Sequence, residues 1–130
     1  MHFKLITHDR VIFDEDVNEI YTKGVDGEFG ILENHVPLMT ALDVGVTKVV
    51  QGENIHFFTT MGGIFQFKDN SAILLTDVAE CGADIDVARA KSALERAEAR
   101  LADKSAEIDA KRAEAALARA KARLKVAISE

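Results

Sequence analysis

The fold of this chain is decided by residues 80–90, which read Glu80-Cys81-Gly82-Ala83-Asp84-Ile85-Asp86-Val87-Ala88-Arg89-Ala90. All eight glycines and the only proline lie at or before Gly82. The 48 residues that follow contain neither, and sixteen of them are alanine. Because glycine and proline interrupt helices and alanine favours them, the sequence predicts a turn-rich β domain over residues 1–82 and a helical arm over residues 83–130.

The β domain is indicated by short apolar or alternating segments that are separated by turn residues. These segments lie at residues 3–7, 17–23, 44–50, 55–61, 64–67 and 73–78. Strands of this length and spacing favour an antiparallel sandwich or barrel. We expect Gly62-Gly63 to end one strand, and we expect the runs Val49-Val50 and Ile73–Leu75 to be buried on both faces.

The helical arm is indicated by apolar residues that recur at steps of three and four. One seam consists of Val87, Ala90, Leu94, Ala97 and Leu101, and a second of Ala106, Ala110, Ala113, Leu117, Ala120, Leu124 and Ala127. The step of five between Leu101 and Ala106 breaks the phase, so we expect two antiparallel helices joined near residues 102–105. Seams of alanine bury little surface, so the hairpin can also extend into one long helix.

The ends of these helices are predicted from capping residues. Asp84 is a candidate N-cap of the first helix, with Asp86 in its first turn, where carboxylates suit the helix dipole. Asp103 or Ser105 could cap the second helix. The first helix is therefore expected to begin at Asp84.

The charge distribution and the single cysteine limit the classes of partner and compartment. Residues 1–81 carry a net charge of −8 and residues 82–130 one of +2, which argues against nucleic acid as a partner. Cys81 cannot form an internal disulfide, and this indicates either a reducing compartment or a protein that is indifferent to redox state. There is no apolar run of roughly 18–20 residues and no signal-like N-terminal segment, so we expect a cytoplasmic location without membrane insertion.

No constellation of residues predicts catalysis or metal binding. The four histidines, at positions 2, 8, 35 and 56, do not stand at metal-ligand spacing to one another or to Cys81. No Ser/His/Asp or Cys/His order suggests a nucleophile. Asp14, Glu15 and Asp16 are expected to form a solvated turn.

The arginines of the arm offer a binding site. Arg89 and Arg96 are seven residues apart, and Arg119 and Arg123 are four apart, so each pair shares a helix face. An antiparallel hairpin would bring all four to the end nearest the β domain. Guanidinium groups match phosphate oxygens, but the same pattern also suits a charged helix surface with i,i+4 pairs, and both readings stay open at this point.

A glycine-rich segment carries a family resemblance. Residues 27–38 read Gly27-Glu28-Phe29-Gly30-Ile31-Leu32-Glu33-Asn34-His35-Val36-Pro37-Leu38. On pattern alone this is a sandwich loop, because the glycines lack the spacing of a dinucleotide fingerprint and no P-loop lysine follows. With this segment, the Ile85–Ala90 motif and the alanine-rich tail, the chain resembles the epsilon subunits of bacterial F-type ATP synthase over nearly its whole length. Glu33 stands where family members often have proline or a small residue.

The resemblance implies a fold and a place in an assembly. It implies a β-sandwich of about ten strands followed by a C-terminal two-helix hairpin that can extend. It implies a non-catalytic subunit of the central stalk that couples gamma to the c-ring loops, with Glu28 and His35 at or near that contact. The extended arm would run along gamma toward the alpha and beta subunits and inhibit ATP hydrolysis. The subunit would be peripheral, on the cytoplasmic face of the bacterial plasma membrane.

The resemblance also implies a regulatory ligand. Some bacterial members bind ATP on the folded arm, and the positions of that site match Glu80, Ile85, Asp86, Arg89, Ala90, Arg96, Arg119 and Arg123. ATP would then be a regulatory ligand, with no cofactor required. Two alternatives remain: an ATP sensor that serves another assembly, and a structural helical adaptor that binds no ligand.

Overall fold

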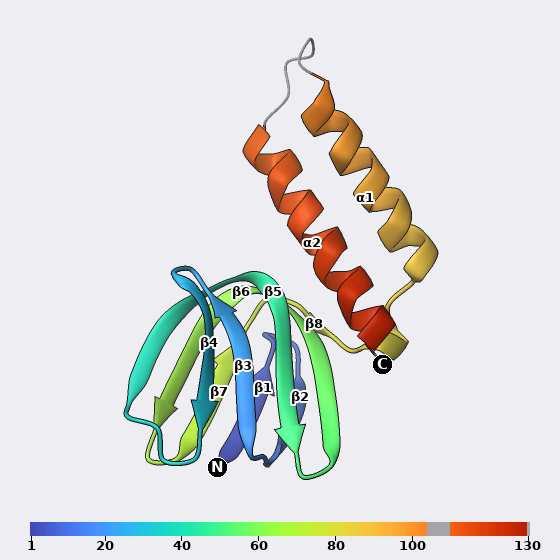
Figure 1. Ribbon diagram of the computed structural model, residues 1–130. Coiled ribbons are helices and arrows are strands. Elements are labelled where there is room, and N and C mark those ends of the chain that lie inside the picture. The colour runs from blue at the N-terminus through green and yellow to red at the C-terminus, as the bar shows by residue number, and fades with distance from the viewer. Residues whose placement is uncertain (104–109, 130) are drawn as a thin grey trace.

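The residues that the computed structural model describes, 1–103 and 110–129, form a β-sandwich with eight strands and a two-helix arm (Figure 1). The strands are β1 (His2–Ile6), β2 (Val11–Asp16), β3 (Glu19–Gly24), β4 (Gly27–Leu32), β5 (Leu38–Gln51), β6 (Asn54–Lys68), β7 (Ser71–Leu75) and β8 (Ala79–Glu80). The arm consists of the 3-10 turn η1 (Gly82–Asp84) and the helices α1 (Val87–Ala102) and α2 (Ala110–Ser129). The predicted class, a β-sandwich followed by a helical hairpin, is therefore confirmed.

The two longest strands belong to both layers of the sandwich. The pairing of β5 with β6 steps from Leu42–Gly63 to Val44–Met61 and bypasses Gly62. Gly62 and Gly63 have φ angles of 75° and 114°, and a Cβ atom at Gly63 would lie 1.9 Å from the carbonyl oxygen of Leu75. The glycines thus bend β6 and do not end it, which corrects the sequence-based expectation. With β5 and β6 each counted as two arms, the eight described strands give about the ten that the resemblance implied.

The strand order is β2-β1-β7-β6-β5-β3-β4, and β8 pairs with β6. One pair departs from the expected antiparallel arrangement, because β1 and β7 run parallel, with Phe3 opposite Ala72. The departure follows from topology: β1 lies between its hairpin partner β2 and the later strand β7.

The core consists of inward-facing residues from both layers. Its fully buried large side chains are Phe3, Leu5, Ile20, Ile31, Val49, Phe65, Phe67 and Leu74. Phe13 and Phe58 join β2 to β6 with ring centroids 5.8 Å apart. Each such side chain contributes about 1.5–3 kcal/mol of burial free energy. The prediction for Ile73–Leu75 was wrong in part, since Leu74 is buried and both neighbours are exposed on the outer face.

The first helix of the arm begins later than expected. Asp86, and not Asp84, is the N-cap of α1, and its carboxylate accepts a hydrogen bond from the Arg89 amide. Asp84 ends η1, where its carboxylate accepts hydrogen bonds from the Cys81 amide and thiol. Asp103 is the C-cap of α1, so the helix ends where the break was predicted, whereas Ser105 and Ala106 lie outside the described residues.

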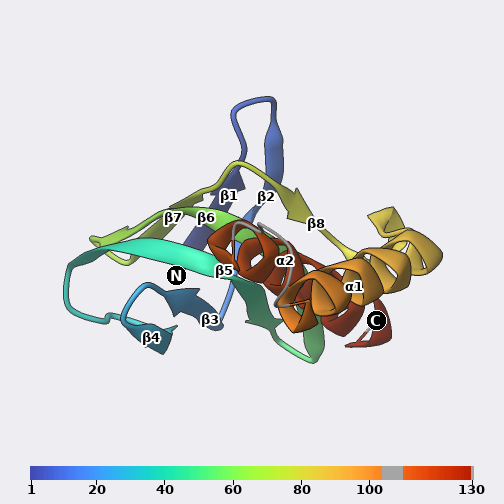
Figure 2. The same cartoon turned by 90° about the horizontal axis from the view of Figure 1, so that it is seen from above.

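The second helix packs on both sides. Ala113 and Ala120 are buried in the seam toward α1, as the heptad pattern predicts. On another face, Ala122 and Val126 are buried as well, and α2 lies against β5 and β6 (Figure 2). The sequence pattern does not predict this second face, because small alanines around a helix do not mark which sides are covered.

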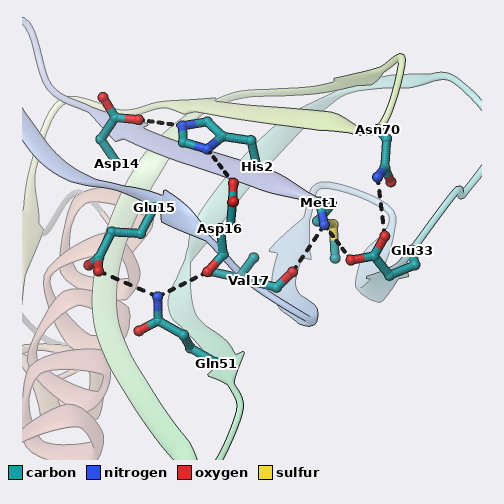
Figure 3. A network of polar contacts seen from close by, with 9 residues as sticks. All are labelled: Met1, His2, Asp14, Glu15, Asp16, Val17, Glu33, Gln51 and Asn70. Atoms are coloured by element: carbon teal, nitrogen blue, oxygen red, sulfur yellow. Dashed lines mark hydrogen bonds and ion pairs between the residues drawn. The ribbon is translucent and has the colours of Figure 1, made fainter.

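A polar network joins β1 to its neighbours at the sandwich end away from the arm (Figure 3). The carboxylate of Glu33 accepts hydrogen bonds from the Met1 amino group and from the Asn70 side chain, and these lower the pKa of Glu33. His2 lies between two carboxylates, with Nδ1 2.8 Å from Asp16 Oδ1 and Nε2 in contact with Asp14. Hydrogen bonds to Asp16 and Asp14 raise the pKa of His2 above its usual 6.5.

The raised pKa of His2 predicts a pH-dependent contribution to stability. A group whose pKa is higher in the folded state stabilises that state fully below its unfolded pKa and loses this contribution as the pH rises through the folded value. We expect His2→Gln to lower the free energy of unfolding at pH 5 and to leave it unchanged at pH 9. Chemical denaturation at both pH values measures this, and an equal loss at the two would contradict it.

Candidate functional site

A pocket of about 370 Å³ lies where the arm meets the sandwich. It is lined by Glu80, Asp84, Ile85, Asp86, Arg89, Ala90, Ala93, Arg96 and Arg123. The structure thus brings together seven of the eight residues that the resemblance assigned to ATP. The eighth, Arg119, is half-buried on α2 and stands outside this lining in the described part of the chain.

Helix geometry explains why these side chains converge. Arg89, Ala93 and Arg96 follow one another at steps of four and three, so they share one face of α1. Because α2 returns antiparallel to α1, Arg123 near its C-terminal end lies beside the first turns of α1. Ala93 and Asp84 were missed from the sequence, although the same periodicity places Ala93 on the face of Arg89.

An ion pair ties the arm to the sandwich at this pocket. Arg123 donates from Nε to Glu80 Oε1 at 2.9 Å, across 43 positions of sequence. The same carboxylate oxygen accepts from Thr59 Oγ1 at 3.1 Å, and the Glu80 amide donates back to Thr59 Oγ1 at 3.0 Å. Glu80 is therefore held by β6 on one side and holds α2 on the other.

The remaining charges leave donors directed at the pocket. The carboxylates of Asp84 and Asp86 already accept hydrogen bonds from Cys81 and from the Arg89 amide. Within residues 1–103 and 110–129, the guanidinium groups of Arg89 and Arg96 make no ion pair. Arg89 and Arg96 thus offer two guanidinium groups without an ion pair among the described residues, and Arg123 offers a third that Glu80 holds in place. Such a set suits an anion with several oxygens, such as a polyphosphate.

The thiol beside the pocket is poorly suited to chemistry. Cys81 is half-buried, and its Sγ lies 3.1 Å from Asp84 Oδ2. Burial, followed by the hydrogen bond to Asp84, raises the pKa of this thiol. Since the thiolate is the nucleophile, Cys81 is a weak one.

The two residues assigned to stalk contacts lie far apart. Glu28 is at the start of β4, in a groove beneath Lys121 and Lys125 of α2. His35 follows the other end of β4, where its Nδ1 lies 2.7 Å from the Val36 carbonyl oxygen and its ring contacts Phe67 edge-on. The four steps of strand from Glu28 to Leu32 span roughly 13 Å, so the two residues lie toward opposite ends of β4.

An apolar surface crosses the outer face of the layer formed by β2, β1, β7 and the adjoining arms of β6 and β5. Cross-strand pairing aligns Ile6 with Val11 and Leu75, Leu75 with Ile64, and Ile64 with Ala41. We define the outer stripe as Ile6, Val11, Ala41, Ile64 and Leu75. Val11, Ile64 and Leu75 are each about half exposed. Apolar residues gathered in this way mark an interaction surface.

The described residues contain neither a candidate membrane-spanning helix nor a candidate metal cluster. Neither α1 nor α2 is long and apolar enough to cross a membrane. In the same part of the chain, no group of three or more histidine, cysteine, aspartate or glutamate side chains could hold a metal ion.

Comparison with known families covers both parts of the chain. Residues 1–82 match the model "ATP synthase, Delta/Epsilon chain, beta-sandwich domain", and residues 83–127 match "ATP synthase, Delta/Epsilon chain, long alpha-helix domain". The ATP synthase epsilon chain of Desulforamulus reducens is 44% identical over 77% of this chain and 76% of its own length. That of Pelotomaculum thermopropionicum is 43% identical over 78% and 76%.

A solved structure has the same architecture. A chain of the Euglena gracilis mitochondrial ATP synthase, from its OSCP/F1/c-ring assembly, superposes with a TM-score of 0.83 at 25% identity. The alignment covers 97% of this chain and 79% of that one. The likeness includes the arm as well as the sandwich.

The corrected cap of α1 leads to a test. Asp86→Ala should fray the first turn, because loss of an N-cap acceptor costs about 1 kcal/mol. We expect exchange of the amide protons of residues 87–90 to become roughly fivefold faster in the ligand-free protein. Asp86→Asn, which keeps an acceptor, and Asp84→Ala should both behave like the wild type in hydrogen-exchange NMR. Fraying in Asp84→Ala but not in Asp86→Ala would reverse the assignment.

Proposed function

The chain belongs to the delta/epsilon chain family of ATP synthases, as an epsilon subunit of the central stalk. On this premise, we propose that its arm makes it an ATP-responsive regulator of the enzyme. Folded against the sandwich, the arm would bind ATP. Extended along gamma, it would reach the alpha and beta subunits and inhibit ATP hydrolysis. The subunit itself would be non-catalytic, and it would lie on the cytoplasmic face of the membrane as a peripheral part of the complex.

The observation that carries this proposal is the convergence of Arg89, Arg96 and Arg123 on one pocket beside Glu80. The residues come from α1, α2 and β8, so the pocket exists only while the hairpin is folded and docked. A purely structural adaptor would have no need of two guanidinium groups on α1 that have no ion-pair partner among the described residues and lie beside Arg123 of α2.

Linkage explains how such a pocket would act as a switch. A ligand that binds only the folded arm stabilises it by RT ln(1 + [ATP]/Kd), which is about 2.7 kcal/mol at a hundredfold excess over Kd. The seam between α1 and α2 is buried mainly through Ala90, Ala97, Ala113 and Ala120, which bury little apolar area. A stabilisation of this size is therefore large enough to decide between the folded and the extended arm.

The outer stripe is proposed to bind gamma. A subunit that stays attached while its arm moves needs a docking surface that the arm does not use. The folded arm lies against β5, β6 and the groove at Lys23 and Glu28, whereas the outer stripe lies on the other layer. His35, beyond the end of β4, would provide a separate contact toward the stalk and the c-ring loops, whereas Glu28, which shares a groove with α2, would be open to such a contact when the arm extends.

Titration with ATP tests the ligand. Arg89→Ala and Arg96→Ala should each weaken ATP binding by roughly 10–100-fold, because a charge-assisted hydrogen bond contributes about 1.5–3 kcal/mol. Arg119→Ala should have a much smaller effect, since Arg119 stands outside the pocket lining among the described residues. Calorimetry and backbone NMR on the full chain measure this. Absence of saturable binding to the wild type at millimolar ATP would overturn the ATP site.

Two isoleucines of equal exposure test the docking surface. Ile64, in the outer stripe, and Ile55, on the other layer, are each 50% exposed. Ile64→Gln should weaken the binding of gamma roughly tenfold, which is the effect of losing a residue central to an interface. Ile55→Gln is the matched control and should bind like the wild type. Equal weakening in the two variants would place gamma elsewhere.

A further inference from the structure

We propose that Thr59 is a positioning residue. Its hydroxyl orients Glu80, which fixes the position of Arg123 and thereby docks the arm on the sandwich. Thr59 lies on β6, directly opposite Glu80 of β8. It acts through Glu80, which lines the pocket, and is not itself one of the lining residues. Where the argument extends to ATP, it rests on the function proposed above.

The geometry forms a chain of three residues. Thr59 is fully buried, and its hydroxyl has a double contact with Glu80, donating to Oε1 and accepting from the amide. Glu80 Oε1 then accepts from Arg123 Nε at 2.9 Å. Only one edge of the Arg123 guanidinium is engaged in this way, so its remaining N–H groups can serve the pocket.

The chemistry at position 59 requires a hydroxyl. A single group has to donate a hydrogen bond to a carboxylate and accept one from an amide, and a hydroxyl does both. Valine has the same shape but can do neither. Serine keeps the hydroxyl and loses only a methyl group. The residue type, and not only its volume, therefore decides whether Glu80 keeps its orientation.

The support of Glu80 is otherwise slight. Strand β8 has two residues, Ala79 and Glu80, and among the described strands it pairs with β6 alone. Without the hydroxyl of Thr59, the Glu80 side chain gains rotamer freedom. Its carboxylate is then no longer held in position for the ion pair with Arg123. Arg123 is the arginine that α2 contributes to the pocket. Both the docking of α2 and the orientation of the Arg123 guanidinium in the pocket therefore depend on Thr59, a residue inside the sandwich.

Three variants of the full chain test the proposal. Thr59→Val removes the hydroxyl, and Thr59→Ser keeps it. Thr47→Val is the matched control, because Thr47 is also fully buried and its hydroxyl bonds to Thr22 and Thr60 within the sandwich. Glu80→Gln provides a variant that leaves the buried position untouched and removes only the charge that holds Arg123.

Hydrogen exchange in the ligand-free protein gives the first result. We expect Thr59→Val and Glu80→Gln to speed the exchange of α2 amides roughly fivefold, the effect of one hydrogen bond of about 1 kcal/mol. Thr59→Ser and Thr47→Val should match the wild type in α2. The side-chain Nε–H signal of Arg123 should shift in Thr59→Val and return in Thr59→Ser. Equal α2 exchange in Thr59→Val and Thr47→Val would overturn the proposal.

ATP titration gives the second result and separates the two proposals. Thr59→Val should weaken ATP binding roughly fivefold relative to Thr47→Val. Unchanged affinity would overturn the role of Thr59 in the pocket. Failure of the wild type to bind ATP would overturn the ATP site alone, while the exchange of α2 in the ligand-free protein would still decide whether Thr59 positions the arm.

Discussion

The bend of β6 at Gly62 and Gly63 is the constraint on which both functional surfaces depend. The backbone of Leu75 passes so close to Gly63 that a side chain at that position would collide with it. Before the bend, β6 carries Thr59, which holds Glu80 and through it the arm. After the bend, β6 carries Ile64, which lies in the outer stripe. One strand thus connects the surface proposed to bind gamma with the support of the arm that is proposed to move.

The arm is held by contacts of two kinds, and their difference suits a switch. Alanines form the seam between α1 and α2, which allows close packing with little buried area. Against the sandwich, α2 buries Ala122 and Val126, and the Glu80–Arg123 ion pair adds a single directional link. Neither contact is large, so a ligand that binds the same arginines, as proposed for ATP, would shift the proposed balance between docked and undocked arm.

Much of the fold could be predicted, and the errors share a cause. The change in composition after Gly82 predicts the boundary between the β domain and the arm. The break in hydrophobic periodicity predicts where α1 ends, at Ala102. The mistakes at Asp84, Gly62-Gly63 and Ile73 concern residues whose local pattern allows two outcomes. An aspartate near a helix start can cap a 3-10 turn or the helix, a glycine pair can end or bend a strand, and an apolar run can face a core or an interface.

The sequence by itself determined the two-part architecture, the helical arm and the family, because these rest on residue type and on spacing along the chain. Only the tertiary structure decided which arginines meet, since Arg119 and Arg123 share a helix but only Arg123 reaches Glu80. It also separated Glu28 from His35 by the length of β4, and it brought Thr59 opposite Glu80 across 21 positions. The physical reason is that a hydrogen bond acts over about 3 Å, and such proximity between distant residues is set by strand register and helix docking.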